Sequence, residues 1–318
     1  MRVPARPLLN LAPVVGDPRA GDGVVVGNAG PFAVGDVVGG HYRIRGLLGR
    51  GGMSYVHEAD DLTLRRRVAI KVDDRRDPRP LLQEAQALAA VRHPGLPAVY
   101  ELGAFRGWPF LVLERLYGVT AAQRLDAPGP DTRLDVAEVV RILAGVAEVL
   151  IAVHTAGMTH RDVKPSNVML CAHERVVLLD FGIMVPEVAA GWTDVCGTPG
   201  YVAPEVGTGE VRPGRAHLVD LYALGVTGIE LLTGWTPLGA TTQVDPLTLA
   251  PANVPPPDLR SARPDVPEAL AALIDACRAW APADRPASIE QVAWELRAIQ
   301  RRLPRFASGS SIGFRASR

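Results

Sequence analysis

The chain has 318 residues, of which 47% are hydrophobic, and it carries 34 basic and 34 acidic side chains. A chain of this length forms one large domain or two lobes and needs no disulfide or metal to complete its core. Zero net charge gives no electrostatic reason to expect binding to nucleic acid or an anionic membrane. Three widely spaced cysteines favour a reducing cytoplasm over a disulfide framework or a four-thiolate zinc site. No apolar run is long enough to predict a membrane span, and the N-terminus lacks the apolar core of a signal peptide.

The first predicted elements follow a leader. Residues 1–40 contain 8 glycines and 5 prolines and few apolar clusters, which predicts a flexible leader. Three short β-like runs then follow, each bounded by glycine or charged turns, at 42–48, 55–60 and 66–72.

A helix and two strands come next. Pro80 opens a helical apolar pattern that stops before His93-Pro94-Gly95. Two more strands are predicted at 99–103 and 109–116.

Helical patterns dominate the remainder of the chain. Asp135 with Glu138 predicts a capping box for a long helix, and Ser288 with Gln291 predicts another. The segment 236–267 is rich in proline, which argues against regular structure there. The pattern predicts an α+β protein with a small β-rich lobe followed by a larger helical lobe.

The first chemical signal is the segment Gly49-Arg50-Gly51-Gly52-Met53-Ser54-Tyr55-Val56. A glycine-rich turn between strands lets backbone N–H groups approach phosphate oxygens, although alone it is equally consistent with a plain hairpin. The next strand carries Val68-Ala69-Ile70-Lys71, and the following helix carries Glu84. A lysine beside such a loop can pair with phosphate oxygens while a helix glutamate holds it in place.

The second signal is His160-Arg161-Asp162-Val163-Lys164-Pro165-Ser166-Asn167, followed by Asp180-Phe181-Gly182. An aspartate five residues before an asparagine can place a base near a hydroxyl and an amide oxygen near a metal. Asp180 supplies a second hard oxygen of the kind that magnesium prefers.

The third signal is Gly197-Thr198-Pro199-Gly200-Tyr201-Val202-Ala203-Pro204-Glu205, with Asp220 and Arg285 in later helical segments. With all motifs in this order, the chain from about His41 to Arg302 resembles a eukaryotic-like (Hanks-type) serine/threonine protein kinase of the sort found in bacteria. The resemblance implies the bilobal protein-kinase fold, with a β-rich N-lobe that has one main helix and a mostly helical C-lobe. The resemblance therefore implies a flexible leader at 1–40, a kinase domain at 41–303 with lobes of about 41–114 and 117–303, and a short tail at 304–318.

The resemblance also implies roles for the catalytic residues. Lys71 would bind phosphates and pair with Glu84. Asp162 would be the catalytic base or would orient the substrate hydroxyl, and Lys164 would neutralise the γ-phosphoryl group. The implied magnesium ligands are Asn167 and Asp180.

Further roles follow from the same resemblance. The implied nucleotide contacts besides Lys71 are Leu48, Gly49, Gly51, Gly52, Val56, Ala69, Glu114, Leu116 and Met169, with Leu113 as gatekeeper. Thr198 would lie in the substrate loop. Glu205 would pair with Arg285, and Asp220 would brace the catalytic loop. Arg161 would receive a phosphate on Thr193, the predicted autophosphorylation site.

The implied cofactors are ATP and Mg²⁺, with Mn²⁺ as an alternative metal. Protein serines and threonines are the implied substrates, with self-association for autophosphorylation, no nucleic-acid partner and a cytoplasmic location. Two alternatives stay open, a pseudokinase scaffold and a small-molecule phosphotransferase of similar fold. The chain departs from the family pattern at Ser54, where a third glycine is usual, and at Arg115, a charge in the hinge.

Lysine usage gives a separate argument for an active site in use. Lys71 and Lys164 are the only lysines among the 34 basic residues, and the rest are arginine. We interpret this as a genomic bias that replaces lysine wherever arginine can substitute. A compact ammonium is not interchangeable with a planar guanidinium beside a phosphoryl group, so both lysines are predicted to be functional.

Overall fold

The computed structural model describes residues 30–50, 54–127, 133–181, 185–186, 197–235 and 258–303. These described residues fall into two compact units. We call the first the N-lobe, which contains the described residues up to Ala90 together with Pro97–Leu116. We call the second the C-lobe, which contains Val91–Leu96 and the described residues from Tyr117 onward.

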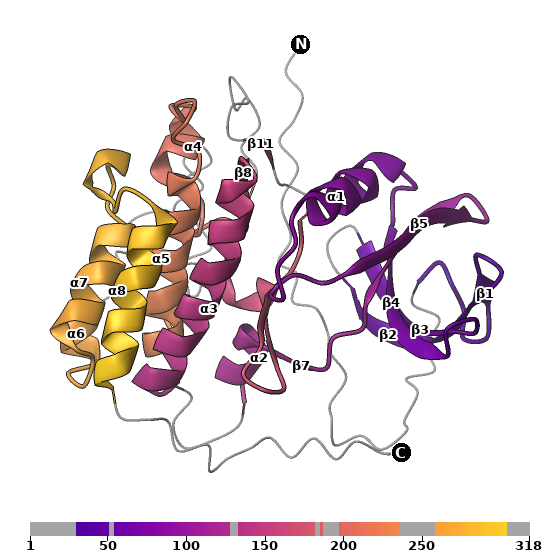
Figure 1. Ribbon diagram of the computed structural model, residues 1–318, viewed down its shortest axis with the longest axis horizontal. Helices are drawn as coiled ribbons and strands as arrows, with labels where there is room; N and C mark the ends of the chain where they lie inside the picture. Colours follow the sequence, from indigo (N-terminus) through magenta and orange to yellow (C-terminus); the bar gives the residue numbers. More distant parts are fainter. Residues whose placement is uncertain are drawn as a thin grey trace. The chain divides into compact units, whose positions relative to one another are not determined.

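The N-lobe is built on one antiparallel sheet. Its strands are β1 (Val37–Val38), β2 (Tyr42–Arg50), β3 (Ser54–Asp61), β4 (Arg66–Asp73), β5 (Val99–Phe105) and β6 (Trp108–Glu114). Their order in the sheet is β1-β2-β3-β4-β6-β5. Figure 1 labels β1 to β5 of this sheet. The β2–β3 pairing is irregular at Ile44/Gly46 and at Leu47/Gly49, and such bulges bend and twist a strand.

Alternation along β4 separates two faces of the N-lobe sheet. Val68, Ile70 and Val72 belong to a buried apolar cluster on one face. Ala69 and Lys71 alternate with them and therefore lie on the other face, because successive strand residues point to opposite sides. The sequence of this one strand thus places the predicted phosphate-binding lysine opposite the core.

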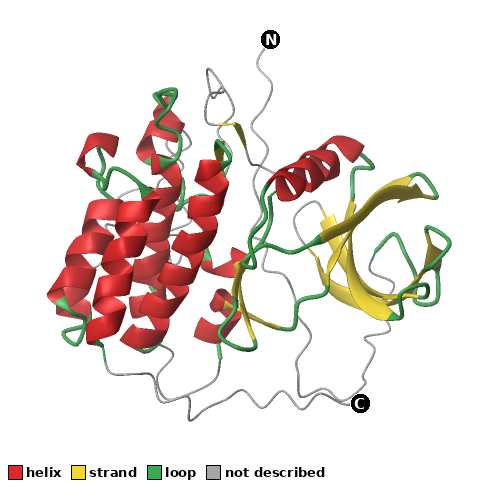
Figure 2. Cartoon of the chain, in the orientation of Figure 1, coloured by secondary structure: helices red, strands yellow, loops and turns green. Residues whose placement is uncertain are grey.

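The helix of the N-lobe is α1 (Pro78–Ala90), which lies beside the sheet strands in Figure 2. Leu81 and Ala85 pack on Leu111 of β6. Glu84 is buried in the same turn of the helix, so the packing of two apolar neighbours fixes where its carboxylate lies.

The N-lobe begins earlier than the sequence predicts. Residues 30–40 were assigned to a flexible leader, but Phe32 is only 5% exposed and joins the core cluster with Val38. The Phe32 ring lies 5.7 Å from that of Phe105, and β1 pairs with β2. The assignment is wrong for these residues because a single phenylalanine and a two-residue strand complete an otherwise open apolar core.

Four longer helices form most of the C-lobe. They are α3 (Val136–Thr155), α5 (Leu218–Thr233), α7 (Glu268–Cys277) and α8 (Ile289–Arg302). Gly225 and Gly228 of α5 face Ile274 of α7 so closely that an added Cβ would meet Ile274 atoms at 3.0–3.1 Å. The short elements of this lobe are α2 (Ala121–Leu125), η1 (Pro165–Asn167), α4 (Pro204–Thr208), α6 (Leu259–Ala262) and η2 (Pro282–Asp284).

Short strands frame the predicted catalytic residues. A three-stranded sheet consists of β7 (Gly118–Thr120), β9 (Val168–Cys171) and β10 (Val176–Leu178). A separate pair consists of β8 (Met158–Thr159) and β11 (Val185–Pro186). The loop from His160 to Lys164 therefore runs between β8 and the turn η1, with both ends attached to regular structure.

The helix starts agree with the sequence only in part. Ser288 caps α8 by accepting a hydrogen bond from Gln291 N. Asp135 caps α3 through Ala137 N at 2.7 Å, but Glu138 is buried and accepts a hydrogen bond from Arg124 at 3.1 Å. The capping-box prediction at α3 is therefore wrong for Glu138, whose carboxylate instead binds Arg124 and so links α3 to α2.

Of the proline-rich segment 236–267, the structure describes residues 258–267, which contain the single turn α6. Among all described helices, none combines the length and the apolar character needed to cross a membrane.

Candidate active site

The N-lobe brings Lys71 and Glu84 together. Lys71 Nζ donates to Glu84 Oε2 at 2.6 Å, and the two side chains are 14% and 4% exposed. Because β4 carries the lysine and α1 carries the glutamate, the pair fixes the helix to the sheet. The ammonium is thereby held on the sheet face opposite the core.

The other predicted nucleotide contacts of the N-lobe lie close to this pair in the sheet. Val56 on β3 is directly opposite Lys71, and Ala69 on β4 is directly opposite Leu113 on β6. Directly opposed residues share a face of the sheet. Gly49 is buried, whereas Gly51 and Gly52 lie outside the described residues.

In the C-lobe, Asp162 is the centre of a hydrogen-bonded cluster. Lys164 Nζ donates to Asp162 Oδ2 at 2.7 Å, and the Thr198 hydroxyl donates to Asp162 Oδ1 at 2.6 Å. Lys164 also donates to the Thr198 hydroxyl oxygen. Asp162 is 7% exposed. The cluster joins the catalytic loop to a substrate-loop residue 36 positions later.

Asn167 is oriented by the same carboxylate. Its amide nitrogen donates to Asp162 Oδ2 at 2.8 Å and to the Asp162 carbonyl at 2.9 Å. This assignment turns the amide oxygen away from Asp162, as the group that can bind a cation. The Asn167 carbonyl accepts from Leu179 N at 2.8 Å, which ties the asparagine turn to the residue before Asp180.

Asp180 and Arg161 both have left-handed backbone conformations. Their φ angles are +64° and +73°, which cost a non-glycine residue about 1–2 kcal/mol each. Phe181, next to Asp180, is buried and contacts His160 edge-on, with ring centroids 4.8 Å apart. Strained backbone of this kind concentrates at functional sites.

Asp220 stabilises the strained loop at Arg161 through hydrogen bonds to its backbone. Its carboxylate accepts from the backbone N–H of His160 and of Arg161, each at 2.8 Å, and lies 2.8 Å from His154 Nε2. Burial would raise the pKa of Asp220, but the hydrogen bonds from His154 and the Arg161 backbone outweigh it, so the pKa is lowered. Burial lowers the pKa of His160, which favours the neutral ring.

Glu205 and Arg285 form a buried bidentate pair. Arg285 Nη1 and Nη2 donate to Glu205 Oε1 and Oε2 at 2.6 and 2.8 Å. The arginine side chain is fully buried. The pair fixes the end of the substrate loop to the turn before α8.

Two residues in contact with this region were not among those predicted from the sequence. One is His154, near the end of α3, whose Nε2 lies 2.8 Å from the Asp220 carboxylate. Tyr201 donates its hydroxyl to Glu230, whose pKa burial raises to about 7. The sequence does contain a signal for the second contact, because Glu230 is an isolated acid within the apolar run of α5. An acid at such a position is expected to be buried and to have a polar partner.

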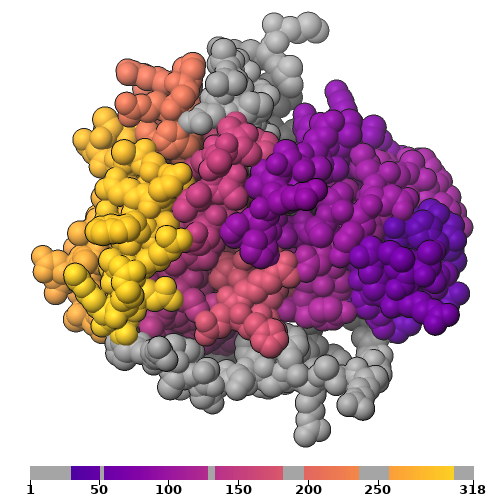
Figure 3. All heavy atoms as spheres, in the orientation of Figure 1, coloured from indigo at the N-terminus to yellow at the C-terminus, as the bar shows by residue number. Residues whose placement is uncertain are grey.

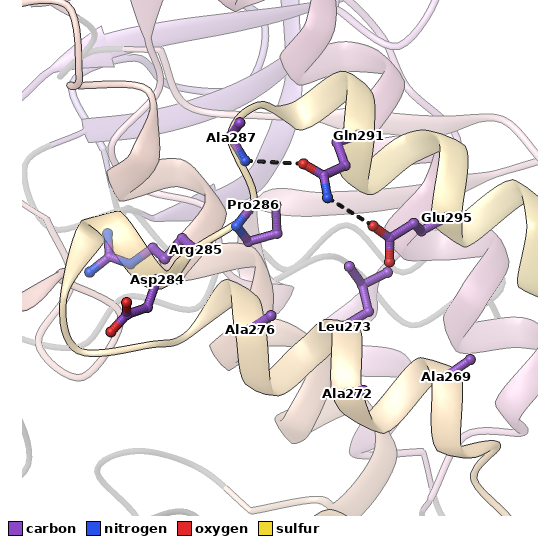
Figure 4. A pocket seen from close by; sticks show the side chains of 10 residues that line it. All are labelled: Ala269, Ala272, Leu273, Ala276, Asp284, Arg285, Pro286, Ala287, Gln291 and Glu295. Atoms are coloured by element: carbon purple, nitrogen blue, oxygen red, sulfur yellow. Dashed lines mark hydrogen bonds between the residues drawn. The ribbon is translucent and has the colours of Figure 1, made fainter.

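The pocket shown in Figure 4 is separate from these catalytic residues. It has a volume of about 440 Å³ and lies between α7 and α8 (Figure 4). Apart from Arg285, no predicted site residue among those described lines it. Gln291 accepts from Ala287 N and donates to Glu295 along its wall. In the space-filling view α8 lies at the surface (Figure 3), where Trp294 is 64% exposed.

Comparison with known proteins identifies relatives of this chain. The family model described as protein kinase domain matches residues 42–295. Serine/threonine-protein kinase pkn3 of Myxococcus xanthus is 35% identical over 297 residues, covering 86% of this chain and 53% of the relative. Serine/threonine-protein kinase PknB of Mycobacterium tuberculosis is 37% identical over 280 residues, covering 81% and 42%. The chain thus spans about half the length of these two relatives.

A solved structure supports the same grouping. The kinase domain of Mycobacterium tuberculosis PknI, crystallised as a double mutant, matches with a TM-score of 0.66 at 29% identity, covering 85% of this chain and 99% of that domain. The predicted kinase fold, with its β-sheet N-lobe and helical C-lobe, is confirmed. The chain belongs to the protein kinase family, and its relatives are bacterial Hanks-type serine/threonine kinases.

Proposed function

We propose that this protein transfers the γ-phosphoryl group of ATP to serine and threonine hydroxyls of proteins. The observation that carries the proposal is the triangle of Asp162, Lys164 and Thr198. A base, a cation for the transferred phosphoryl group and a substrate-loop hydroxyl meet in one cluster. The base and the cation are groups that phosphoryl transfer to a hydroxyl uses, and the Thr198 hydroxyl holds the base in position.

The chemistry of each residue follows from its contacts. Asp162 accepts the proton of the attacking hydroxyl or orients that hydroxyl, and its two oxygens are held in place by Lys164 and Thr198. Lys164 can then turn its ammonium to the developing charge on the phosphoryl oxygens. In the N-lobe, Lys71 binds phosphate oxygens while Glu84 fixes its position.

Asn167 and Asp180 are the residues that would hold Mg²⁺. An amide oxygen and a carboxylate are hard donors that suit this ion, and Mn²⁺ accepts the same donor set. The bound ion would neutralise charge on the β- and γ-phosphates. The hydrogen bonds that fix the Asn167 amide support this assignment because they orient its oxygen.

The two alternative functions are less well supported. A pseudokinase needs no ordered base, yet Asp162 is buried within a complete cluster. A small-molecule phosphotransferase has no need of Thr198 and the loop that follows it, whose end here is anchored by the Glu205–Arg285 pair. A cytoplasmic location and self-association stay predictions.

A transfer assay tests the proposal. The purified chain is incubated with γ-labelled ATP, magnesium and a generic basic protein. We expect label on serine and threonine of the protein, and its loss in Asp162→Asn with unchanged circular dichroism. Asp275→Asn is the matched control, because among the described residues the one ion pair of Asp275 is an exposed pair with Arg278. ATP binding without labelling would indicate a pseudokinase.

We also propose intermolecular autophosphorylation at Thr193, with Arg161 as the receiver of the phosphate. Thr193 lies outside the described residues, so this proposal rests on the family resemblance and on the affinity of phosphate for arginine. Mass spectrometry of the active protein and assay of Thr193→Ala test it. An unmodified Thr193 in fully active protein would contradict it.

A further inference from the structure

Residues 30–38, which we call the N-terminal strap, pack across the N-lobe core. The strap contributes Phe32 to that core, where the side chain is 5% exposed. Two backbone hydrogen bonds attach the strap to β2, since Gly35 N donates to the Ile44 carbonyl and Ile44 N donates to the Asp36 carbonyl, each at 2.9 Å. One aromatic side chain and a few backbone hydrogen bonds therefore hold the strap on the sheet.

His57 on β3 is covered by the strap. It lies on the core face of the sheet, because it is directly opposite Ile70, a member of the core cluster. The side chain is 2% exposed, and its ring lies 5.6 Å from the ring of Phe32. A Cβ added to Gly30 would lie 2.9 Å from His57 Cε1 and 3.0 Å from Nε2. Among the described residues, His57 Nε2 has no hydrogen-bond partner, so the strap shields a bare ring nitrogen from water.

In the described part of the N-lobe, the charges around His57 lie on the opposite face of the sheet or are already paired. The charges on the opposite face follow from strand alternation and from the ion pair between β2 and β3, and they are Arg45, Glu58, Asp60 and Lys71. The acids on the side of His57 each have a cationic partner, and the pairs are Asp36–Arg106, Asp61–Arg66 and Glu101–His41. The neighbour of His57 on the same face of β3 is Tyr55, an uncharged phenol.

The buried ring binds a proton weakly. Burial lowers the pKa of His57 to about 4, although a hydrogen bond to the Gly46 backbone acts in the opposite direction. A histidine ring in water has a pKa of about 6.5. The pKa is thus lower when the strap is closed than when the ring meets water. The closed state is therefore favoured above about pH 6.5, and this preference is lost as the pH falls towards about 4.

We propose that the N-terminal strap is an acid-sensitive switch, which stays closed over neutral His57 and opens when Nε2 takes up a proton. The inference goes beyond the proposed function and does not depend on it. With the strap closed, protonated Nε2 would be a buried donor without an acceptor and would carry a charge removed from water. Because the strap is attached by so few contacts, it can open while the central strands stay paired.

Hydrogen exchange of the full chain, followed by mass spectrometry, tests the switch. Protection of residues 33–38 is measured at about pH 7.5 and about pH 5, each relative to the intrinsic exchange rate at that pH. We expect protection to fall about thirtyfold, which is the effect at pH 5 of a pKa that rises from about 4 to about 6.5 on opening. Protection of β4 should stay unchanged. Equal protection of the strap at both pH values, or equal losses in the strap and β4, would overturn the inference.

Variants identify the group that takes up the proton. His57→Gln keeps a polar side chain that does not titrate, and the ratio of protection between the two pH values should fall to about one. His41→Gln is the matched control, because His41 is a partly exposed histidine of the same lobe that pairs with Glu101. Its ratio should stay as in the wild type. A wild-type ratio in His57→Gln would refute the assignment to His57.

Asp36 is the other titratable group of the strap, and Asp36→Asn tests it. This variant loses the ion pair with Arg106, so we expect lower protection at both pH values and an unchanged ratio. A ratio near one in Asp36→Asn would assign the switch to Asp36 and overturn the inference.

Two features keep the test decisive. If His57→Gln melts far below the wild type, His57→Leu replaces it, and the comparison of the wild type with Asp36→Asn still decides. Because no nucleotide is used, the outcome is independent of whether the chain transfers phosphate.

Discussion

Glu205→Ala should destabilise the C-lobe far more than the loss of a surface ion pair. The Arg285 guanidinium has no exposure, and its two terminal nitrogens both donate to Glu205. Arg285 also donates to the carbonyls of Leu218, Ala279 and Trp280. These neutral acceptors stay in place after the substitution, but the buried charge loses its counter-charge.

Breaking a buried pair by removing one partner typically costs about 3–5 kcal/mol. For a unit of this size that corresponds to a melting temperature lowered by roughly 6–20 °C. The matched control is Asp275→Ala, which removes the exposed partner of Arg278, with side chains 27% and 49% exposed. A pair in that setting contributes about 0–1 kcal/mol.

Urea unfolding followed by circular dichroism measures both variants against the wild type. The double variant Glu205→Leu/Arg285→Met removes both charges and should recover part of the loss, since a well-packed apolar pair can replace a buried ion pair. A loss below about 1 kcal/mol in Glu205→Ala would refute the argument from burial. Equal losses in Glu205→Ala and Asp275→Ala would refute it as well.

Three other predictions concern charge and packing. Lys71→Arg and Lys164→Arg should both lose most transfer activity although each keeps its charge, and near-normal rates for both would remove the argument from lysine usage. The raised pKa of Glu230, about 7, means that the folded state holds its proton more tightly than the unfolded chain. The stability from this group is therefore present in acid and lost as pH rises from about 4.5 through 7, by a few kcal/mol at most. Glu230→Gln should abolish that decline when the free energy of unfolding is measured against pH, and an unchanged slope would contradict it. Phe32→Ala should destabilise the N-lobe by about 3–5 kcal/mol in the same unfolding assay, and a loss below about 1 kcal/mol would show that the segment is not part of the core.

The sequence predicted the fold best where residue pattern alone determines structure. The strand of Lys71 alternates core and site residues, so both its type and its faces follow from period two. The apolar periodicity of α3 and α8 likewise predicted those helices.

Predictions from local sequence pattern were weaker where a single long-range contact determines whether a residue is buried or which partner it has. Phe32 is one apolar residue in a glycine-rich segment, and only the open end of the N-lobe core shows why it is buried. Glu138 has the spacing of a capping residue, but Arg124 is a stronger partner for a buried carboxylate.

In the candidate site, too, local motifs identify the residues, whereas long-range contacts bring them together. The motifs named Asp162, Lys164 and Thr198, but only the fold brings Thr198 to Asp162 across 36 positions. The contact between Arg115 and Glu58 spans 57 positions and leaves no periodic trace in the sequence.

The rate of phosphoryl transfer in Asp180→Asn tests the central claim most directly. Asp180 is the carboxylate assigned to the metal, and its loss should remove electrostatic stabilisation of the transition state. We predict a rate at least about a thousandfold below the wild type in a variant with unchanged circular dichroism and melting temperature. A folded Asp180→Asn variant that transfers phosphate within about tenfold of the wild-type rate would contradict the kinase mechanism proposed for this chain.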